Sequence, residues 1–155
     1  MKILVFSVGE KDYGADITQV REVIRKRKVT PVPEAASFVE GVISLRGRVI
    51  PLINLRKKLG MKSQEVPSNR IVVTTIQNHW TGILVDQVRD VVTVKPEDIT
   101  KPDDLLQSAA YLMGMTKWQG KLVLLVDLTG FLRGEESEGL QKVHERVEIK
   151  KKDTP

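Results

Sequence analysis

Short apolar runs alternate with polar turns along most of this 155-residue chain. Residues 3–8 read ILVFSV and residues 70–76 read RIVVTTI, and each run is followed by a polar turn and a second β-rich run. Two such runs around a turn that contains Gly or Asn predict a β-hairpin. Residues 41–55, GVISLRGRVIPLINL, predict another hairpin, with Gly47 at the bend because glycine adopts positive φ readily.

The chain also matches itself twice, in the same order. Residues 41–59 align without gaps with residues 114–132 at an offset of 73. Upstream, residues 14–24 align with residues 82–92 at an offset of 68, around a shared Gln-Val-Arg. Two ordered matches indicate an internal duplication.

Each copy contains about five short strands without strand–helix alternation, which predicts a mainly β fold of two small five-stranded, SH3-like barrels. A few short helices are expected, including single turns after the last strand of each copy. Lobes of roughly 65–70 residues are marginal alone, so we expect them to share a core. We expect one domain over residues 1–155, with repeat cores at about 14–59 and 82–132 and terminal strands that can cross over. Gly47 and its counterpart Gly120 are expected to be structural turn glycines.

Two further local features shape this prediction. Pro51 has no N–H for a ladder, so its strand is expected to be an edge strand or to be bulged there. Residues 134–155 begin with glutamates and end with lysines, and their apolar positions recur at helical spacing. This pattern predicts a charged C-terminal helix with a frayed tail.

Residues that commonly act in catalysis or bind metals are scarce in this sequence. There is no cysteine, which excludes disulfides and thiolate sites. Neither His79 nor His144 has a second histidine or a carboxylate at metal-ligand spacing, and no nucleotide-binding or nucleophile motif occurs. Asp86 and Asp127 follow apolar runs and are interpreted as strand-end turn residues. We therefore expect no enzyme, metal or cofactor, and a cytoplasmic protein whose start is a strand rather than a signal peptide.

The net charge of +5 raises a nucleic-acid alternative. Positive charge gathers in three clusters: residues 25–28, 56–58 and 150–152. Small barrels that bind single strands combine basic grooves with stacking aromatics, and this chain has seven aromatic residues. Phe6, Tyr13 and Phe131 lie in apolar patterns that favour the core, which leaves Trp118 as the best stacking candidate. Solvated charged faces are the simpler interpretation, so no nucleic acid is expected.

The run FVEGVISLRGRVIPLINLRKKLG, residues 38–60, resembles the most recognisable segment of the CheW family of chemotaxis coupling proteins. Ser44 stands where that family usually has Asn. Three other segments also match: LVFSVGEKDYGADITQVREVI, GILVDQVRDVVTV and GKLVLLVDL. The resemblance covers roughly residues 3–133. It implies two intertwined five-stranded barrels and a non-catalytic adaptor between a chemoreceptor's cytoplasmic hairpin tip and the regulatory domain of a CheA-type histidine kinase.

The resemblance also assigns residues. Arg46 corresponds to a receptor-contact arginine, and it aligns with Gln119 in the second copy, so the turn itself does not demand arginine. Valines of the repeated Gln-Val-Arg segments correspond to a receptor groove between the lobes, although their periodicity alone favours a core role. They are Val20, Val88 and Val91, with Val23 added by repeat symmetry. For the kinase contact we expect the strand start Gly41, Val42 and Ile43.

Two alternatives remain open beside this interpretation. One is a paralogue that serves a non-flagellar motility or developmental pathway and keeps a single partner interface. The other is the basic nucleic-acid-binding barrel. In the lead interpretation the protein reaches the membrane only indirectly, through receptors.

Overall fold

The computed structural model describes residues 1–61, 69–102 and 111–131. The predicted C-terminal helix, His144 and the basic cluster 150–152 lie outside the described residues. Within the described part, no helix is both long and apolar enough to cross a membrane.

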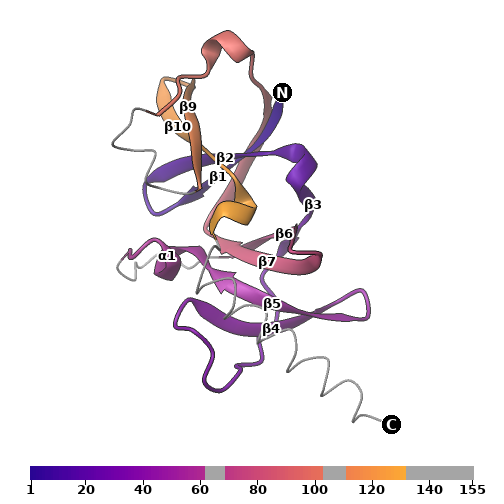
Figure 1. Cartoon of the computed structure of the whole chain (residues 1–155). Helices are drawn as coiled ribbons and strands as arrows, with labels where there is room; N and C mark the ends of the chain where they lie inside the picture. Colours follow the sequence, from indigo (N-terminus) through magenta and orange to yellow (C-terminus); the bar gives the residue numbers. More distant parts are fainter. Residues whose placement is uncertain (62–68, 103–110, 132–155) are drawn as a thin grey trace.

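The described part of the chain is built from β-strands and single helical turns (Figure 1). The strands are β1 (Lys2–Val8), β2 (Lys11–Asp16), β3 (Val20–Arg25), β4 (Val39–Leu45), β5 (Arg48–Asn54), β6 (Arg70–Ile76), β7 (His79–Val85), β8 (Gln87–Thr93), β9 (Leu112–Trp118) and β10 (Lys121–Val126). The short helices are η1 (Ile17–Gln19), α1 (Leu55–Lys58), η2 (Pro96–Asp98) and η4 (Leu128–Phe131).

These strands form two five-stranded sheets that exchange strands between the halves of the chain. One sheet has the order β8-β1-β2-β10-β9 and the other β3-β6-β7-β5-β4. We call the first the upper lobe and the second the lower lobe, after their places in Figure 1. The N-terminal hairpin β1–β2 thus lies among strands of the second half, and β6–β7 lies among strands of the first half. The predicted mainly β fold with two five-stranded lobes is confirmed, although in the described part no ladder joins β8 to β9 or β3 to β4.

The hairpins β4–β5 and β9–β10 have matching geometry. Arg46 and Gly47 form the first turn with φ of 51° and 76°, and Gln119 and Gly120 form the second with φ of 52° and 73°. Two consecutive positive φ values are typical of the type I′ turn, which suits the twist of paired strands. This likeness supports the proposed duplication and explains why glycine occupies the second turn position in both copies.

The apolar residues form one core shared by the lobes, a separate core inside each lobe and a smaller cluster of Phe38, Ile53 and Ile76. The shared core contains Leu4, Phe6, Val8, Tyr13 and Ala15 from the upper lobe's N-terminal hairpin, Leu55, Val72, Ile83 and Val85 from the lower lobe, and Val126, Leu128 and Phe131. Ile50, Leu52 and Ile71 lie in the core of the lower lobe, and Val5, Val123 and Leu125 lie in that of the upper lobe. Because the shared core draws on both sheets, neither lobe can bury its apolar face without the other.

The expectation for Pro51 is wrong. Its strand β5 lies between β7 and β4 rather than at an edge, and the register is regular at the Val42–Pro51 pair. The ladder from β5 to β7 begins at Leu52, one residue further on. Proline is tolerated because it stands just before the paired stretch that would need its N–H.

Candidate protein-binding surfaces

Arg46 lies at the tip of the β4–β5 hairpin and is held by Glu22 of β3. Its Nε donates to Glu22 Oε1 at 2.9 Å and its Nη2 donates to Oε2 at 3.1 Å, a two-pronged arrangement. The hydrogen bond from Arg46 holds the pKa of the Glu22 carboxyl below its usual value and raises the pKa of the guanidinium. The Arg46 side chain is nevertheless 68% exposed. It is therefore an oriented arginine that remains open to a partner.

The four predicted receptor valines share one side of their sheets. On β3, Val20 lies opposite Thr74 and Val23 opposite Val72. On β8, the counterparts Val88 and Val91 lie opposite Phe6 and Leu4 of β1. Since Val72, Phe6 and Leu4 belong to the shared core, all four valines stand on the side of the sheets that faces the junction of the lobes.

Burial separates these valines into two pairs. Val20 and Val88 are half-buried and pack against the shared core. Val23 and Val91 are 37% and 49% exposed. Glu22, the partner of Arg46, lies opposite Val73 of the lower-lobe core, so Arg46 approaches β3 from the other side. The structure thus groups the valines and keeps Arg46 apart from them.

The predicted kinase contact at the start of β4 has little side-chain surface. Gly41 is buried with a φ of 147°, and a Cβ there would overlap the carbonyl oxygen of Thr30. Ile43 is 2% exposed and belongs to the lower-lobe core. Val42 is half-buried, and its backbone exchanges two hydrogen bonds with Thr30, at 2.8 and 2.9 Å. Of the three residues, Val42 alone presents a side chain that a partner could touch.

A buried ion pair that the sequence did not suggest connects the lobes. Arg56 of α1 donates from Nη2 to Asp86 Oδ2 at 2.7 Å, and the Gly9 N–H in the β1–β2 turn donates to the same oxygen at 2.7 Å. The side chains of Arg56 and Asp86 are 9% and 6% exposed. Asp86 stands at the bend between β7 and β8, as predicted, and its carboxylate in addition joins the lower-lobe helix to the upper-lobe hairpin.

The turn interpretation holds for Asp127 and its counterpart Asn54. Asp127 Oδ1 accepts from the Thr129 N–H at 3.1 Å and from Gln19 Nε2 at 2.8 Å. Asn54 Oδ1 accepts from the Lys57 N–H at 3.2 Å. Each side chain satisfies an N–H of the helical turn after its strand, the usual role of an N-cap residue.

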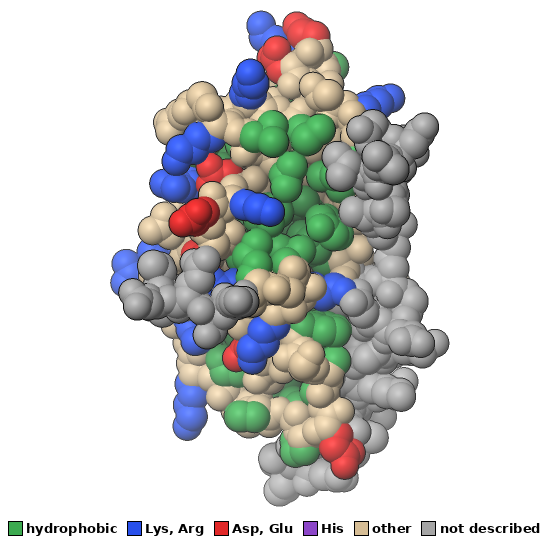
Figure 2. Space-filling model, turned by 90° about the vertical axis from the view of Figure 1, so that its left-hand side faces the viewer, with side chains coloured by type: hydrophobic (Ala, Val, Ile, Leu, Met, Phe, Trp, Pro, Cys, Tyr) green, Lys and Arg blue, Asp and Glu red, His purple; other side chains and the backbone are tan. Residues whose placement is uncertain are grey.

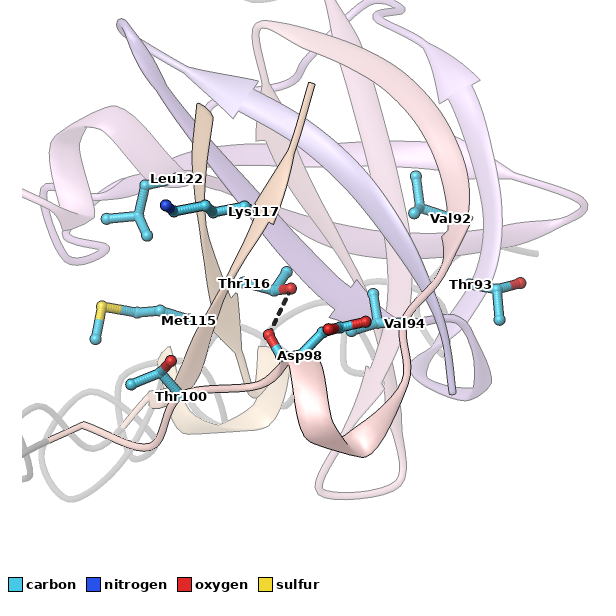
Figure 3. Close-up of a pocket in the computed structure, with 9 residues that line it drawn as sticks. All are labelled: Val92, Thr93, Val94, Asp98, Thr100, Met115, Thr116, Lys117 and Leu122. Atoms are coloured by element: carbon cyan, nitrogen blue, oxygen red, sulfur yellow. Dashed lines mark hydrogen bonds between the residues drawn. The ribbon is translucent and has the colours of Figure 1, made fainter. Parts of the chain in front are cut away.

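The upper lobe carries an apolar surface and an open pocket. Figure 2 shows apolar side chains gathered over this lobe on one face, with charged side chains mostly around them. The β9–β10 hairpin lies on this side in Figure 1, and its Met113 and Leu122 are 54% and 55% exposed. The pocket has a volume of about 620 Å³ and is lined by Val92, Thr93, Val94, Asp98, Thr100, Met115, Thr116, Lys117 and Leu122 (Figure 3). Thr116 Oγ1 donates to the Asp98 carbonyl at 2.9 Å and ties η2 to β9.

The structure also bears on base stacking by Trp118 and on metal binding. Trp118, the stacking candidate, is half-buried and packs against the upper-lobe core, so only part of its indole is open to a stacking base. Among the described residues, no group of three or more His, Cys, Asp or Glu side chains could hold a metal ion.

Two open five-stranded barrels share a core, expose apolar side chains and hold an oriented arginine at a hairpin tip. They define a small double-barrel module suited to binding other proteins. The family model described as CheW-like domain matches residues 2–136, and the chain belongs to this family of chemotaxis scaffold proteins. The chain is 36% identical to the chemotaxis protein CheW of Thermotoga maritima, over 82% of this chain and 84% of that protein. It is 34% identical to the CheW of Rhizobium meliloti, over 88% and 90%.

A solved structure is similar over nearly the same length. It is the crystal structure of the scaffolding protein TtCheW from Thermoanaerobacter tengcongensis, with a TM-score of 0.79 and 32% sequence identity. The match covers 87% of this chain and 94% of that one. At this identity and coverage the likeness extends to the whole double-barrel fold.

Proposed function

We propose that this chain is a non-catalytic adaptor that couples the cytoplasmic tips of chemoreceptors to a CheA-type histidine kinase in bacterial chemotaxis. The observation that carries the proposal is the family match over residues 2–136. Relatives named chemotaxis protein CheW and a similar structure named as a scaffolding protein support it. Such an adaptor works in the cytoplasm and meets the membrane only through the receptors.

The exposed valines are the proposed apolar part of the receptor surface. Val23 and Val91 keep enough exposed area to lose water on binding, whereas Val20 and Val88 are partly used by the shared core. Burying two valine side chains supplies at most about 3–6 kcal/mol. Association itself costs about 4–15 kcal/mol. A single contact is therefore weak, and coupling depends on many adaptors and receptors held in one assembly.

Arg46 is a separate, polar contact proposed for the receptor, because it lies on the other side of β3 from the valines. The pairing with Glu22 uses its Nε and Nη2 and fixes the plane of the guanidinium. Other N–H groups of this exposed side chain can donate to a carboxylate or a backbone carbonyl of the receptor. An arginine already held in place loses less side-chain entropy on binding than a free one.

The test combines the full chain with a chemoreceptor cytoplasmic fragment and a CheA-type kinase, and measures co-sedimentation and kinase autophosphorylation. The adaptor is expected to bind both partners and to change the autophosphorylation rate. Arg46→Ala should weaken receptor binding, whereas Gln119→Ala, at the same turn position of the other lobe, should not. If the chain binds neither partner, the proposal fails.

Binding each partner separately tests a narrower version of the function. The start of β4 offers only Val42 to a kinase, which favours weak binding at that surface. Binding to the receptor fragment without binding to the kinase would identify an adaptor that keeps one interface. That result would support the paralogue alternative over the two-partner coupler.

A further inference from the structure

Trp80 of β7 carries two arginine side chains over its indole ring. The guanidinium carbon of Arg21 lies 4.2 Å from the ring centre, and that of Arg48 lies 3.9 Å from it. Arg21 comes from β3 and Arg48 from β5, which lie on opposite sides of β7 in the lower sheet. Arg21 also donates from Nη1 to Thr75 Oγ1 at 3.3 Å. We call these three side chains the Trp80 platform. Cation–π contact holds its guanidinium groups in place.

The upper lobe has different side chains at the equivalent positions. The repeat offset of 68 relates Trp80 to Asp12 and Arg21 to Arg89. Asp12 is 6% exposed, and its Oδ1 lies 3.9 Å from Arg89 Nε. In the upper lobe, therefore, a carboxylate of the chain itself partly neutralises the arginine. The comparison implies that the fold does not require an indole at this position.

In the lower lobe the Glu22 carboxylate is shared, because it interacts electrostatically with Arg21, Arg27 and Arg46. The nearby Glu22 is engaged by Arg46 on both of its oxygens. Among the described residues, Arg21 and Arg48 form no ion pair, and both are exposed. The Trp80 platform thus presents two oriented guanidinium groups to solvent with an excess of positive charge around them, which favours an anionic partner.

We propose that the Trp80 platform is a docking surface for an acidic segment of a partner protein. Two forked guanidinium groups match carboxylate side chains in geometry and charge. A nucleic acid fits less well, because both arginines stack on the indole that a base would need. The surface uses neither Arg46 nor the receptor valines, so it does not rest on the proposed coupling function.

The probe is a fluorescein-labelled peptide of ten glutamates, titrated with the full chain at low salt and followed by anisotropy. Saturable binding to the unchanged protein is expected. In the double variant Arg21→Ala/Arg48→Ala, affinity should fall by about tenfold or more, because charge-assisted hydrogen bonds are lost. The matched control Arg25→Ala/Lys26→Ala removes the same charge from exposed residues of the same segment and should change affinity by about twofold or less.

Two additions keep the outcome clear if the double alanine variant unfolds. Arg21→Lys/Arg48→Lys keeps the charge but removes the forked N–H donors of the guanidinium groups. It should weaken peptide binding more than the control variant Arg25→Ala/Lys26→Ala does. In a Trp118→Phe background, peptide binding should change the emission of Trp80. Absence of saturable binding, equal losses in the test and control pairs, or an unchanged Trp80 signal would overturn the proposal. Arginine-dependent binding of an oligothymidylate without peptide binding would also overturn it, in favour of a nucleic-acid site.

Discussion

Removing the Asp86 carboxylate is the most direct test of how the two lobes are held together. Asp86→Ala leaves the Arg56 guanidinium buried without its 2.7 Å partner and removes the acceptor of the Gly9 N–H. Breaking a buried ion pair by deleting one member costs roughly 3–5 kcal/mol, since the remaining charge stays desolvated. A domain of this size has a total stability of about 5–15 kcal/mol, so the loss is a large fraction of it.

Urea unfolding followed by circular dichroism measures this loss, and calorimetry gives the change in Tm. At about 2–4 °C per kcal/mol for a chain of this length, Tm should fall by roughly 6–20 °C. Lys57→Ala is the matched control, because it breaks the 2.8 Å pair with Glu40 in which Lys57 is 55% exposed. That exposed pair should contribute no more than about 1 kcal/mol.

A second variant separates the ion pair from a general loss of packing. Replacing both partners, as Arg56→Met/Asp86→Leu, removes the buried charges together and should recover most of the stability lost in Asp86→Ala. A loss below about 1 kcal/mol in the single variant would refute the reasoning. A double variant as unstable as the single one would refute it too.

Three further predictions concern the turns and two titrating groups. Gly47→Ala and Gly120→Ala should each lower the free energy of unfolding in urea by about 1–2 kcal/mol, and by similar amounts, because both glycines have φ above 70°. Burial raises the pKa of Tyr13 from 10.0 to about 12, so the unfolded chain loses this proton at a lower pH than the folded one. The free energy of unfolding is therefore unaffected by ionisation of Tyr13 below pH 10 and falls as pH rises towards 12. Tyr13→Phe should abolish that fall. The lowered pKa of Glu22 stabilises the fold above pH 4.5, and this contribution is lost as pH falls through the lowered value. Arg46→Ala should therefore move the Glu22 pKa, followed by NMR titration, back towards 4.5.

The local pattern of the sequence was sufficient for most strands, because alternation and turn residues act over short distances. The run predicted at 70–76 is β6 as observed, and the turn glycines stand at positive φ. The ion pair between Arg56 and Asp86 could not be predicted in this way, since the residues are 30 apart and meet only after the lobes pack. Pro51 was misjudged because the rule for strand prolines does not state where a ladder begins.

Comparison of the two copies helped with the candidate site where they differ. Arg46 was assigned by the resemblance to the CheW family, and its counterpart Gln119 showed that the turn does not demand arginine; the structure shows an exposed arginine there. The same comparison applied to Trp80 and Asp12 would have identified Trp80 as a position where the copies differ. The cation–π contacts could not be predicted, because they depend on how β3, β5 and β7 are placed in the sheet. The different burial of Val20 and Val23 could not be predicted from the sequence either, because both are valines and both stand on the same side of β3.

The two lobes have equivalent strand orders and matching hairpin turns but different surfaces. Equivalent turns differ at Arg46 and Gln119, and the offset of 73 relates the exposed Met113 of β9 to Glu40 of β4, which pairs with Lys57. Since the backbone of the two turns is nearly the same, these side chains are what distinguishes the lobes there. The lower lobe offers oriented arginines and the upper lobe offers apolar area, so the two lobes present chemically different surfaces.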